Sequence, residues 1–131
     1  ELGLAAHIDN NDRKIGRKGA ELSPQRAALR LATDHPRYKA ADWVICSDAD
    51  EFMNLRTGRT LPDLVNACGP ADAISVCWKL FGNGLHRHYE DIPLTEQFFS
   101  CAPESGFTNF RGAGIKTLFR NNGAFHRMGV H

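Results

Sequence analysis

Three carboxylates fall within four positions of the segment VICSDADEFMNL, residues 44–55, as Asp48, Asp50 and Glu51. Like charges this close repel one another, so they destabilise a fold unless a cation or a set of hydrogen-bond donors lies beside them. Two carboxylates at i and i+2 also suit one hard cation, because Mg²⁺ and Mn²⁺ take one or two protein carboxylates and fill their remaining positions with water and phosphate oxygens. The pattern therefore predicts Mn²⁺ or Mg²⁺ at Asp48 and Asp50, with a nucleotide diphosphate beside it. An EF-hand is excluded, because Met53 stands where that loop requires glycine.

The residues before this acidic segment indicate how it is positioned. Residues 43–46, Trp-Val-Ile-Cys, are apolar without alternation, which is the pattern of a strand that is covered on both faces in the middle of a sheet. Ligands of open α/β sheets bind outside the carboxyl ends of the strands. The acidic segment is therefore expected at the ligand-binding edge of a central strand.

Helix-start signals occur at three further places. Ser23 followed by Pro24 predicts a capped helix that ends at DHPRY. Thr60 with Asp63 three residues later resembles a capping box, and Gly69 closes the short helix that it opens. A third short helix is expected from Thr95.

Four other segments have the composition of strands: 5–8, 73–81, 114–120 and 124–131. Strands that alternate with helices predict an α/β fold with helices on both sides of a sheet. The length of 131 residues corresponds to about one domain.

Composition excludes several classes of protein. A net charge of +1, with no patch of interleaved basic and aromatic residues, argues against a nucleic-acid partner. No apolar run reaches the roughly 18 residues of a membrane helix and no signal-peptide pattern is present, so a cytoplasmic or membrane-peripheral location is expected. The four cysteines have no C-x-x-C spacing and are expected to be buried, reduced thiols.

Six segments together carry a family resemblance: QRAALRLA, ADWVICSDADEFMNL, AISVCWKLFGNG, YEDIPLTEQF, GIKTLFR and GVH. In this order and spacing they resemble the family 2 type glycosyltransferases of GT-A fold, in a bacterial branch with a D-x-D-E-F signature. The resemblance implies a Rossmann-like mixed sheet flanked by helices, a nucleotide-sugar donor, a glycan or other hydroxyl acceptor, and inversion at the anomeric carbon. Because the family's first strand and helix have no counterpart before Glu1, residues 1–131 are expected to form a single partial domain, incomplete at the N-terminus.

The resemblance also implies roles on the donor side. Asp50 looks like the metal ligand, and Asp48 is similar to the aspartate that faces the ribose or a metal-bound water. Glu51 is expected to orient the turn or a basic neighbour. His131 of GVH looks like the distal histidine that completes the metal or diphosphate site.

On the acceptor side, the family uses a carboxylate as general base. The segment YEDIPLTEQF offers Glu96 first, Asp91 second and Glu90 third. Two more residues are assigned to substrate binding: Lys116 and Trp78. Lys116, or equally Arg120, is either a cation near the diphosphate or an exposed charge on a strand, and Trp78 is core or pocket wall. His86 and His88, in a polar loop, are expected to be solvated.

Two other functions remain open from the sequence. A metal-dependent phosphotransferase or phosphohydrolase would use Asp48 as nucleophile and Asp50 as acid. A non-catalytic domain would bind sugar or a partner protein without turnover.

Overall fold

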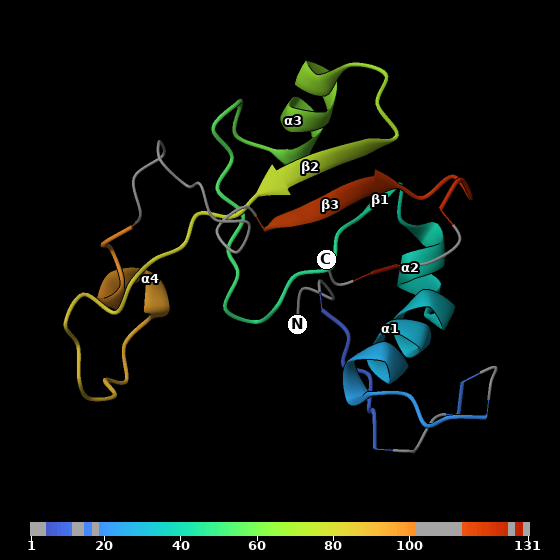
Figure 1. The fold of residues 1–131 in the computed structure, drawn as a ribbon. Helices are drawn as coiled ribbons and strands as arrows, with labels where there is room; N and C mark the ends of the chain where they lie inside the picture. The colour runs from blue at the N-terminus through green and yellow to red at the C-terminus, as the bar shows by residue number, and fades with distance from the viewer. Residues whose placement is uncertain (1–4, 12–14, 17–18, 102–113, 126–127, 130–131) are drawn as a thin grey trace. The chain divides into compact units, whose positions relative to one another are not determined.

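The computed structural model describes residues 5–11, 15–16, 19–101, 114–125 and 128–129. Its helices are α1 (Pro24–Asp34), α2 (Pro36–Ala40), α3 (Leu61–Cys68) and α4 (Leu94–Gln97), and its strands are β1 (Trp43–Val44), β2 (Ala73–Cys77) and β3 (Ile115–Arg120). The strands have the order β1-β3-β2 in a small three-stranded sheet, so the fold is mixed α/β (Figure 1). The chain divides into two compact units, Glu1–Val44 with Arg120–Gly129, and Ile45–Phe119 with Val130–His131.

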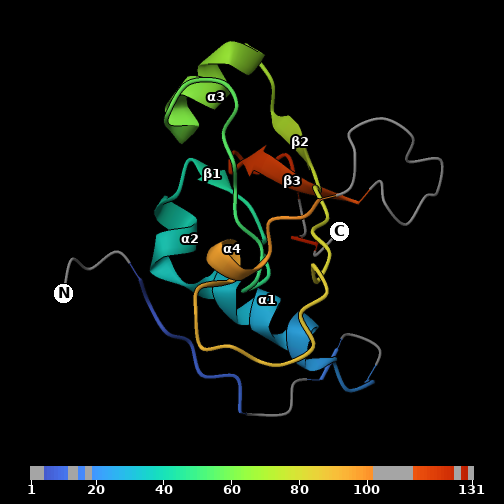
Figure 2. The same cartoon turned by 90° about the vertical axis from the view of Figure 1, so that its left-hand side faces the viewer.

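Two consecutive helices occupy the first unit (Figure 2). The predicted start of α1 is confirmed: the Ser23 hydroxyl accepts a hydrogen bond from the N–H of Arg26 at 3.4 Å, and Pro24 lies in the first turn. His35 then ends α1 and begins α2, where its Nδ1 accepts from the N–H of Arg37 at 3.2 Å. Local capping chemistry therefore sets both helix boundaries.

The residues that follow β3 pack beside β1 in this first unit. The backbone N–H of Asn121 donates to the carbonyl of Asp42 at 2.8 Å, and its side-chain amide donates to the carbonyl of Tyr38 at 2.7 Å. The Arg120 guanidinium lies 4.8 Å from the centre of the Trp43 ring, a cation–π contact. From the sequence, Arg120 is a candidate cation for the diphosphate, whereas in the structure its guanidinium lies against the Trp43 ring.

The second unit is organised around the antiparallel pair β2 and β3, whose register runs from Ala73 opposite Phe119 to Cys77 opposite Ile115. Lys116 and Leu118 share one face of β3, because residues two apart in a strand point the same way. Both are buried, at 5% and 2% exposed. A lysine thus stands next to the most deeply buried apolar side chain of the strand.

The predicted capping box of α3 is confirmed. The Thr60 hydroxyl accepts from the N–H of Asp63 at 3.3 Å, and the Asp63 carboxylate accepts from the N–H groups of Arg59 and Thr60, each at 2.9 Å. These hydrogen bonds, first that from Arg59, lower the pKa of Asp63. Gly69 ends the helix at a φ of 70°, a conformation that favours glycine.

Two strand predictions were wrong. Residues 5–8 are exposed and are not a strand. The apolar run at 43–46 forms only the two-residue β1, at the end of the strand order, so the acidic segment does not follow a central strand. An apolar run indicates burial, whereas a strand also requires a partner for its backbone groups, and that partner is set by distant sequence.

Smaller differences concern the start of one predicted helix, one predicted strand and the burial of the cysteines. The third predicted helix begins one residue earlier, at Leu94, and its N-cap Pro93 supplies no side-chain hydrogen bond. In the predicted strand at 124–131, the described residues 124–125 and 128–129 are not strand, and the others lie outside the described residues. All four cysteines are free, as expected, but Cys46 alone is shielded and the other three are exposed.

Candidate functional site

The acidic segment folds into a turn closed by its own residues. The N–H of Glu51 donates to the carbonyl of Asp48 at 3.1 Å, and the Glu51 carboxylate accepts from the N–H of Asp48 at 2.8 Å and from the Ser47 hydroxyl at 3.3 Å. This i to i+3 pairing makes a β-turn with Ala49 and Asp50 as its central residues. We call residues 47–51 the acidic turn.

A buried lysine supplies the positive charge that the acidic turn requires. The Lys116 ammonium lies 3.2 Å from Oδ2 of Asp48 and 3.2 Å from Oε2 of Glu51, and its side chain is only 6% exposed. It also lies 5.6 Å from the centre of the Trp78 ring. Lysines are almost never this buried unless they are paired. The cation of the turn therefore comes from β3, 68 residues away in sequence from Asp48.

The protonation states of this cluster follow from these contacts. Burial by itself lowers the pKa of Lys116, but the hydrogen bonds and charges of Asp48 and Glu51 outweigh burial and raise it. Burial likewise opposes ionisation of Glu51, yet the N–H of Asp48 and the Lys116 ammonium lower the pKa of that carboxyl. Burial raises the pKa of the nearby Cys46 thiol. The lysine and Glu51 are thus charged at neutral pH, and Cys46 is a protonated thiol rather than a nucleophile.

Asp50 differs from the other two carboxylates of the turn. It is exposed at the tip, and it makes no hydrogen bond or ion pair with any described residue. Asp48 is intermediate, because Lys116 contacts its Oδ2 and its side chain remains 44% exposed. The fold therefore divides three neighbouring carboxylates into two that are engaged by an ammonium and one that is available.

Trp78 packs where a glycine allows its ring to approach the backbone. The N–H of Trp78 donates to the carbonyl of Gly114 at 2.9 Å, and a Cβ on Gly114 would overlap the Trp78 ring. Trp78 is half-buried and forms a wall beside Lys116, in keeping with its sequence interpretation as core or pocket wall. Gly114 thereby lets the indole reach the lysine.

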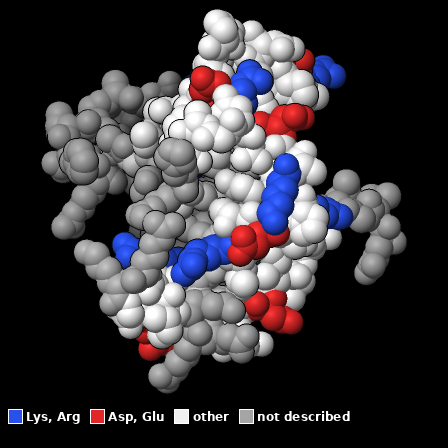
Figure 3. All heavy atoms as spheres, turned by 90° about the vertical axis from the view of Figure 1, so that its right-hand side faces the viewer, with Lys and Arg blue, Asp and Glu red and all other residues white. Residues whose placement is uncertain are grey.

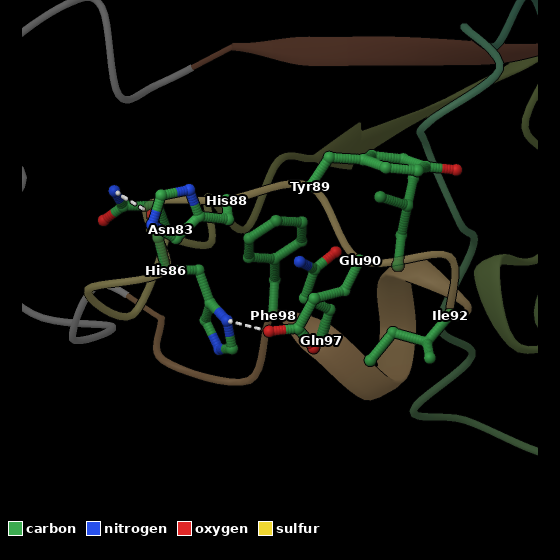
Figure 4. Close-up of a pocket in the computed structure, with 9 residues that line it drawn as sticks. Asn83, His86, His88, Tyr89, Glu90, Ile92, Gln97 and Phe98 are labelled. Carbon is green, nitrogen blue, oxygen red and sulfur yellow. Dashed lines mark hydrogen bonds and ion pairs between the residues drawn. The ribbon is translucent and has the colours of Figure 1, made fainter.

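A separate cavity of about 340 Å³ lies within residues 83–98, a volume within the range of small-molecule sites (Figure 4). Its lining mixes aromatic, apolar and hydrogen-bonding side chains, among them Asn83, His86, Glu90, Gln97 and Phe98. The Nδ1 of His86 lies 3.5 Å from Oε1 of Glu90, and the His86 and Phe98 rings meet edge to face at a centroid distance of 6.0 Å. The cavity therefore presents polar groups beside an aromatic ring.

The predicted acceptor-side carboxylates occupy different places around this cavity. Glu90 lines it, whereas Asp91 and Glu96 do not. Asp91 accepts a hydrogen bond from the Tyr89 hydroxyl at 3.0 Å, and Glu96 lies exposed on α4. Of the residues that sequence reasoning missed, Gln97 is buried at 6% exposed and lines the cavity. No sequence signal marks it, since burial of a glutamine on a four-residue helix depends on tertiary packing.

The donor set of the acidic turn fits a hard divalent cation. Asp50 is an exposed carboxylate, the half-exposed Asp48 beside it is contacted by Lys116, and Mg²⁺ or Mn²⁺ requires only one or two carboxylates. No group of three or more His, Cys, Asp or Glu able to hold a metal occurs within the described part of the chain. His131, the predicted third partner, lies outside the described residues.

On the face drawn in Figure 3, the basic side chains lie among acidic ones, in keeping with the net charge of +1. None of the described helices has the length and apolar character needed to cross a membrane.

No protein-family model, curated protein or solved structure matches the chain.

Proposed function

We propose that this chain functions in inverting glycosyl transfer, which moves a hexosyl group from a nucleotide-diphosphate donor to an acceptor hydroxyl, on a GT-A type sheet. The observation that carries the proposal is the acidic turn, which is held at both ends and leaves Asp50 exposed, with no hydrogen bond or ion pair to any other described residue. The closed turn fixes the backbone that carries Asp50, so little backbone freedom is lost when this carboxylate binds a cation. The D-x-D-E-F resemblance supplies the reaction type.

Asp50 would hold Mn²⁺ or Mg²⁺, with Asp48 facing a metal-bound water or the donor ribose. When bound, the cation would neutralise charge on the departing diphosphate. Lys116 stabilises the turn that carries this site, since its ammonium pairs with Asp48 and Glu51. On the donor side, the residues of the acidic turn keep the turn closed and Asp50 exposed.

On the acceptor side, a carboxylate takes the hydroxyl proton while the hydroxyl oxygen bonds to the anomeric carbon and the bond from that carbon to the diphosphate oxygen breaks. This single displacement inverts the anomeric carbon. Glu96 and Asp91 remain the bases predicted from the resemblance. Glu90, the third carboxylate of that segment, lines the cavity together with Phe98, on which a sugar ring would stack.

Thermal unfolding with a panel of nucleotide sugars tests the donor site. We expect a donor to raise the Tm of the 131-residue chain only when Mn²⁺ is present, and we expect Asp50→Asn to remove the shift. Asp34→Asn, the same change at an exposed position at the end of α1, is the matched control. Equal shifts in the wild type and in Asp50→Asn would refute the donor site.

Three matched variants test the base: Glu90→Gln, Asp91→Asn and Glu96→Gln. The base variant should lower kcat by about 10²- to 10⁴-fold while leaving donor binding nearly unchanged, because a general base acts in the transition state. If none of the three variants lowers kcat in this way, the acceptor side has been misassigned.

A phosphotransferase or phosphohydrolase is the second candidate. The contact between Lys116 and Asp48 favours it, because an ammonium at 3.2 Å could also stabilise a phosphoryl group on that aspartate. Incubation with a radiolabelled phosphoryl donor and acid quenching would trap a phosphoaspartate at Asp48. Label lost in Asp48→Asn would favour this function over glycosyl transfer, and absence of label would count against it.

A further inference from the structure

We propose that the cavity within residues 83–98 binds an uncharged, hydroxylated ring of the size of one sugar residue, and that Gln97 recognises a hydroxyl of that ring. Where the ring belongs to the acceptor, the inference rests on the proposed function. The binding itself rests on the burial and contacts of the lining residues, which hold whichever reaction the chain performs.

Gln97 has a buried side-chain amide that makes no hydrogen bond within the described part of the chain. The residue is 6% exposed, and Figure 4 shows its side chain among those around the cavity. Its role in α4 needs only the backbone, whose N–H donates to the carbonyl of Pro93 at 3.1 Å. An amide carries two N–H donors and an acceptor oxygen, and burying these without partners costs free energy. The fold therefore indicates a partner that enters the cavity.

Three of the other polar side chains that line the cavity already have partners. The Asn83 amide donates to the carbonyl of His86 at 3.3 Å and accepts from a backbone N–H two residues further on at 3.4 Å. The Tyr89 hydroxyl donates to a neighbouring carboxylate at 3.0 Å, and Nδ1 of His86 lies 3.5 Å from Oε1 of Glu90. These pairs fix the wall of the cavity, and Gln97 is the buried group that a ligand would satisfy.

The segment that forms the cavity is closed at its base. Phe81 and Cys101 form an antiparallel bridge, and the N–H of Gly82 donates to the carbonyl of Ser100 at 2.8 Å. These contacts join the two ends of residues 83–99. A segment that is already closed loses less freedom when a ligand binds, and long connections inside a compact domain commonly form binding loops.

The size, charge and shape of the cavity indicate the class of ligand. Its volume of about 340 Å³ is near the lower end of the range of small-molecule sites, which suits a single ring. None of the lining residues is Lys or Arg, and Glu90 contributes a carboxylate, so a phosphate or carboxylate ligand is disfavoured. The face of the Phe98 ring suits apolar C–H groups, and the Gln97 amide suits a hydroxyl. A pyranose presents both kinds of group.

Titration with methyl glycosides, without metal or nucleotide, tests the site. The probes are methyl hexosides and their monodeoxy analogues, and binding is followed by the NMR signals of the Gln97 side-chain amide. We expect one hexoside to shift these signals, and Gln97→Met, which nearly keeps the side-chain volume, to bind that hexoside about tenfold less tightly. Gln25→Met, the same change at an exposed position of α1, is the matched control.

The monodeoxy analogues identify the hydroxyl that Gln97 contacts. One analogue should bind the wild type about tenfold less tightly than the parent hexoside does, because the buried amide is then left unpaired. The same analogue and the parent should bind Gln97→Met equally, because both changes remove one hydrogen bond. Equal losses in the wild type and in Gln97→Met for every analogue would overturn the role of Gln97.

Thermal unfolding without ligand separates recognition from a structural role. Because the Gln97 amide has no partner among the described residues, Gln97→Met should leave the Tm unchanged or raise it. A fall of more than about 4 °C, or failure of this variant to fold, would show that the amide stabilises the fold and would overturn the proposal.

The charge of the ligand is tested with the wild type and Glu90→Gln. A methyl hexuronoside, which carries a carboxylate, should bind the wild type several-fold less tightly than the neutral hexoside, and Glu90→Gln should reduce this difference. Equal binding of the two probes by the wild type would overturn the inference that the ligand is uncharged.

The remaining outcomes separate this proposal from the proposed function. If no methyl glycoside shifts the Gln97 signals, or if nucleosides shift them in place of glycosides, the sugar site is overturned. Glycoside binding in a protein that shows no donor binding with Mn²⁺ would support the site and contradict glycosyl transfer. Glycosyl transfer that Gln97→Met leaves unchanged would support the proposed function and contradict this site.

Discussion

Removal of the Lys116 ammonium should destabilise the protein mainly through Glu51 rather than through Asp48. The two distances are the same, 3.2 Å, but the Glu51 side chain is 23% exposed and the Asp48 side chain 44%. A buried charge-assisted hydrogen bond contributes about 1.5 to 3 kcal/mol, whereas an exposed ion pair contributes about 0 to 1 kcal/mol. We therefore expect coupling free energies of about 1.5 to 2 kcal/mol for Lys116 with Glu51 and about 0.5 kcal/mol for Lys116 with Asp48.

Double-mutant cycles in urea measure these couplings. One cycle combines Lys116→Met with Glu51→Gln, the other combines it with Asp48→Asn, and methionine keeps most of the buried side-chain volume. Asp34→Asn, which lies outside the cluster, should show coupling near zero with Lys116→Met. A coupling to Asp48 that equals or exceeds the coupling to Glu51 would refute the argument that solvent screening decides between the two carboxylates.

Three further predictions concern pH, capping and packing. The folded-state pKa of Glu51 lies below its ordinary value of 4.5, so ionised Glu51 stabilises the folded protein above pH 4.5, and this contribution is lost as the pH falls through the folded-state pKa. Glu51→Gln should therefore weaken the dependence of the free energy of unfolding on pH in the acid range, as urea titrations at several pH values would show. Thr60→Ala should lower the free energy of unfolding by about 1 kcal/mol through loss of the α3 cap, as urea titration at neutral pH would show, and no change would contradict the capping geometry. Gly114→Ala should displace the indole of Trp78 and shift its emission in a Trp43→Phe background; an unchanged spectrum would contradict the close approach.

Features that depend on neighbouring residues could be predicted from the sequence. The start of α1 at Ser23 and the capping box at Thr60 were found because each cap is made within three or four residues. The strand at 114–120 was found because its composition suits a strand. The strand predicted at 5–8 was wrong because apolar character does not supply a pairing partner.

The sequence by itself also determined that a cation was needed at Asp48, Asp50 and Glu51, because three carboxylates in four positions repel one another wherever they are placed. Only the tertiary structure decided which cation it is. Lys116 reaches the acidic turn across 68 residues of sequence, because β3 places it on the buried face beside Trp78. Charge repulsion is local and can be inferred from spacing, whereas the choice of partner depends on strand pairing between segments that the sequence does not bring together.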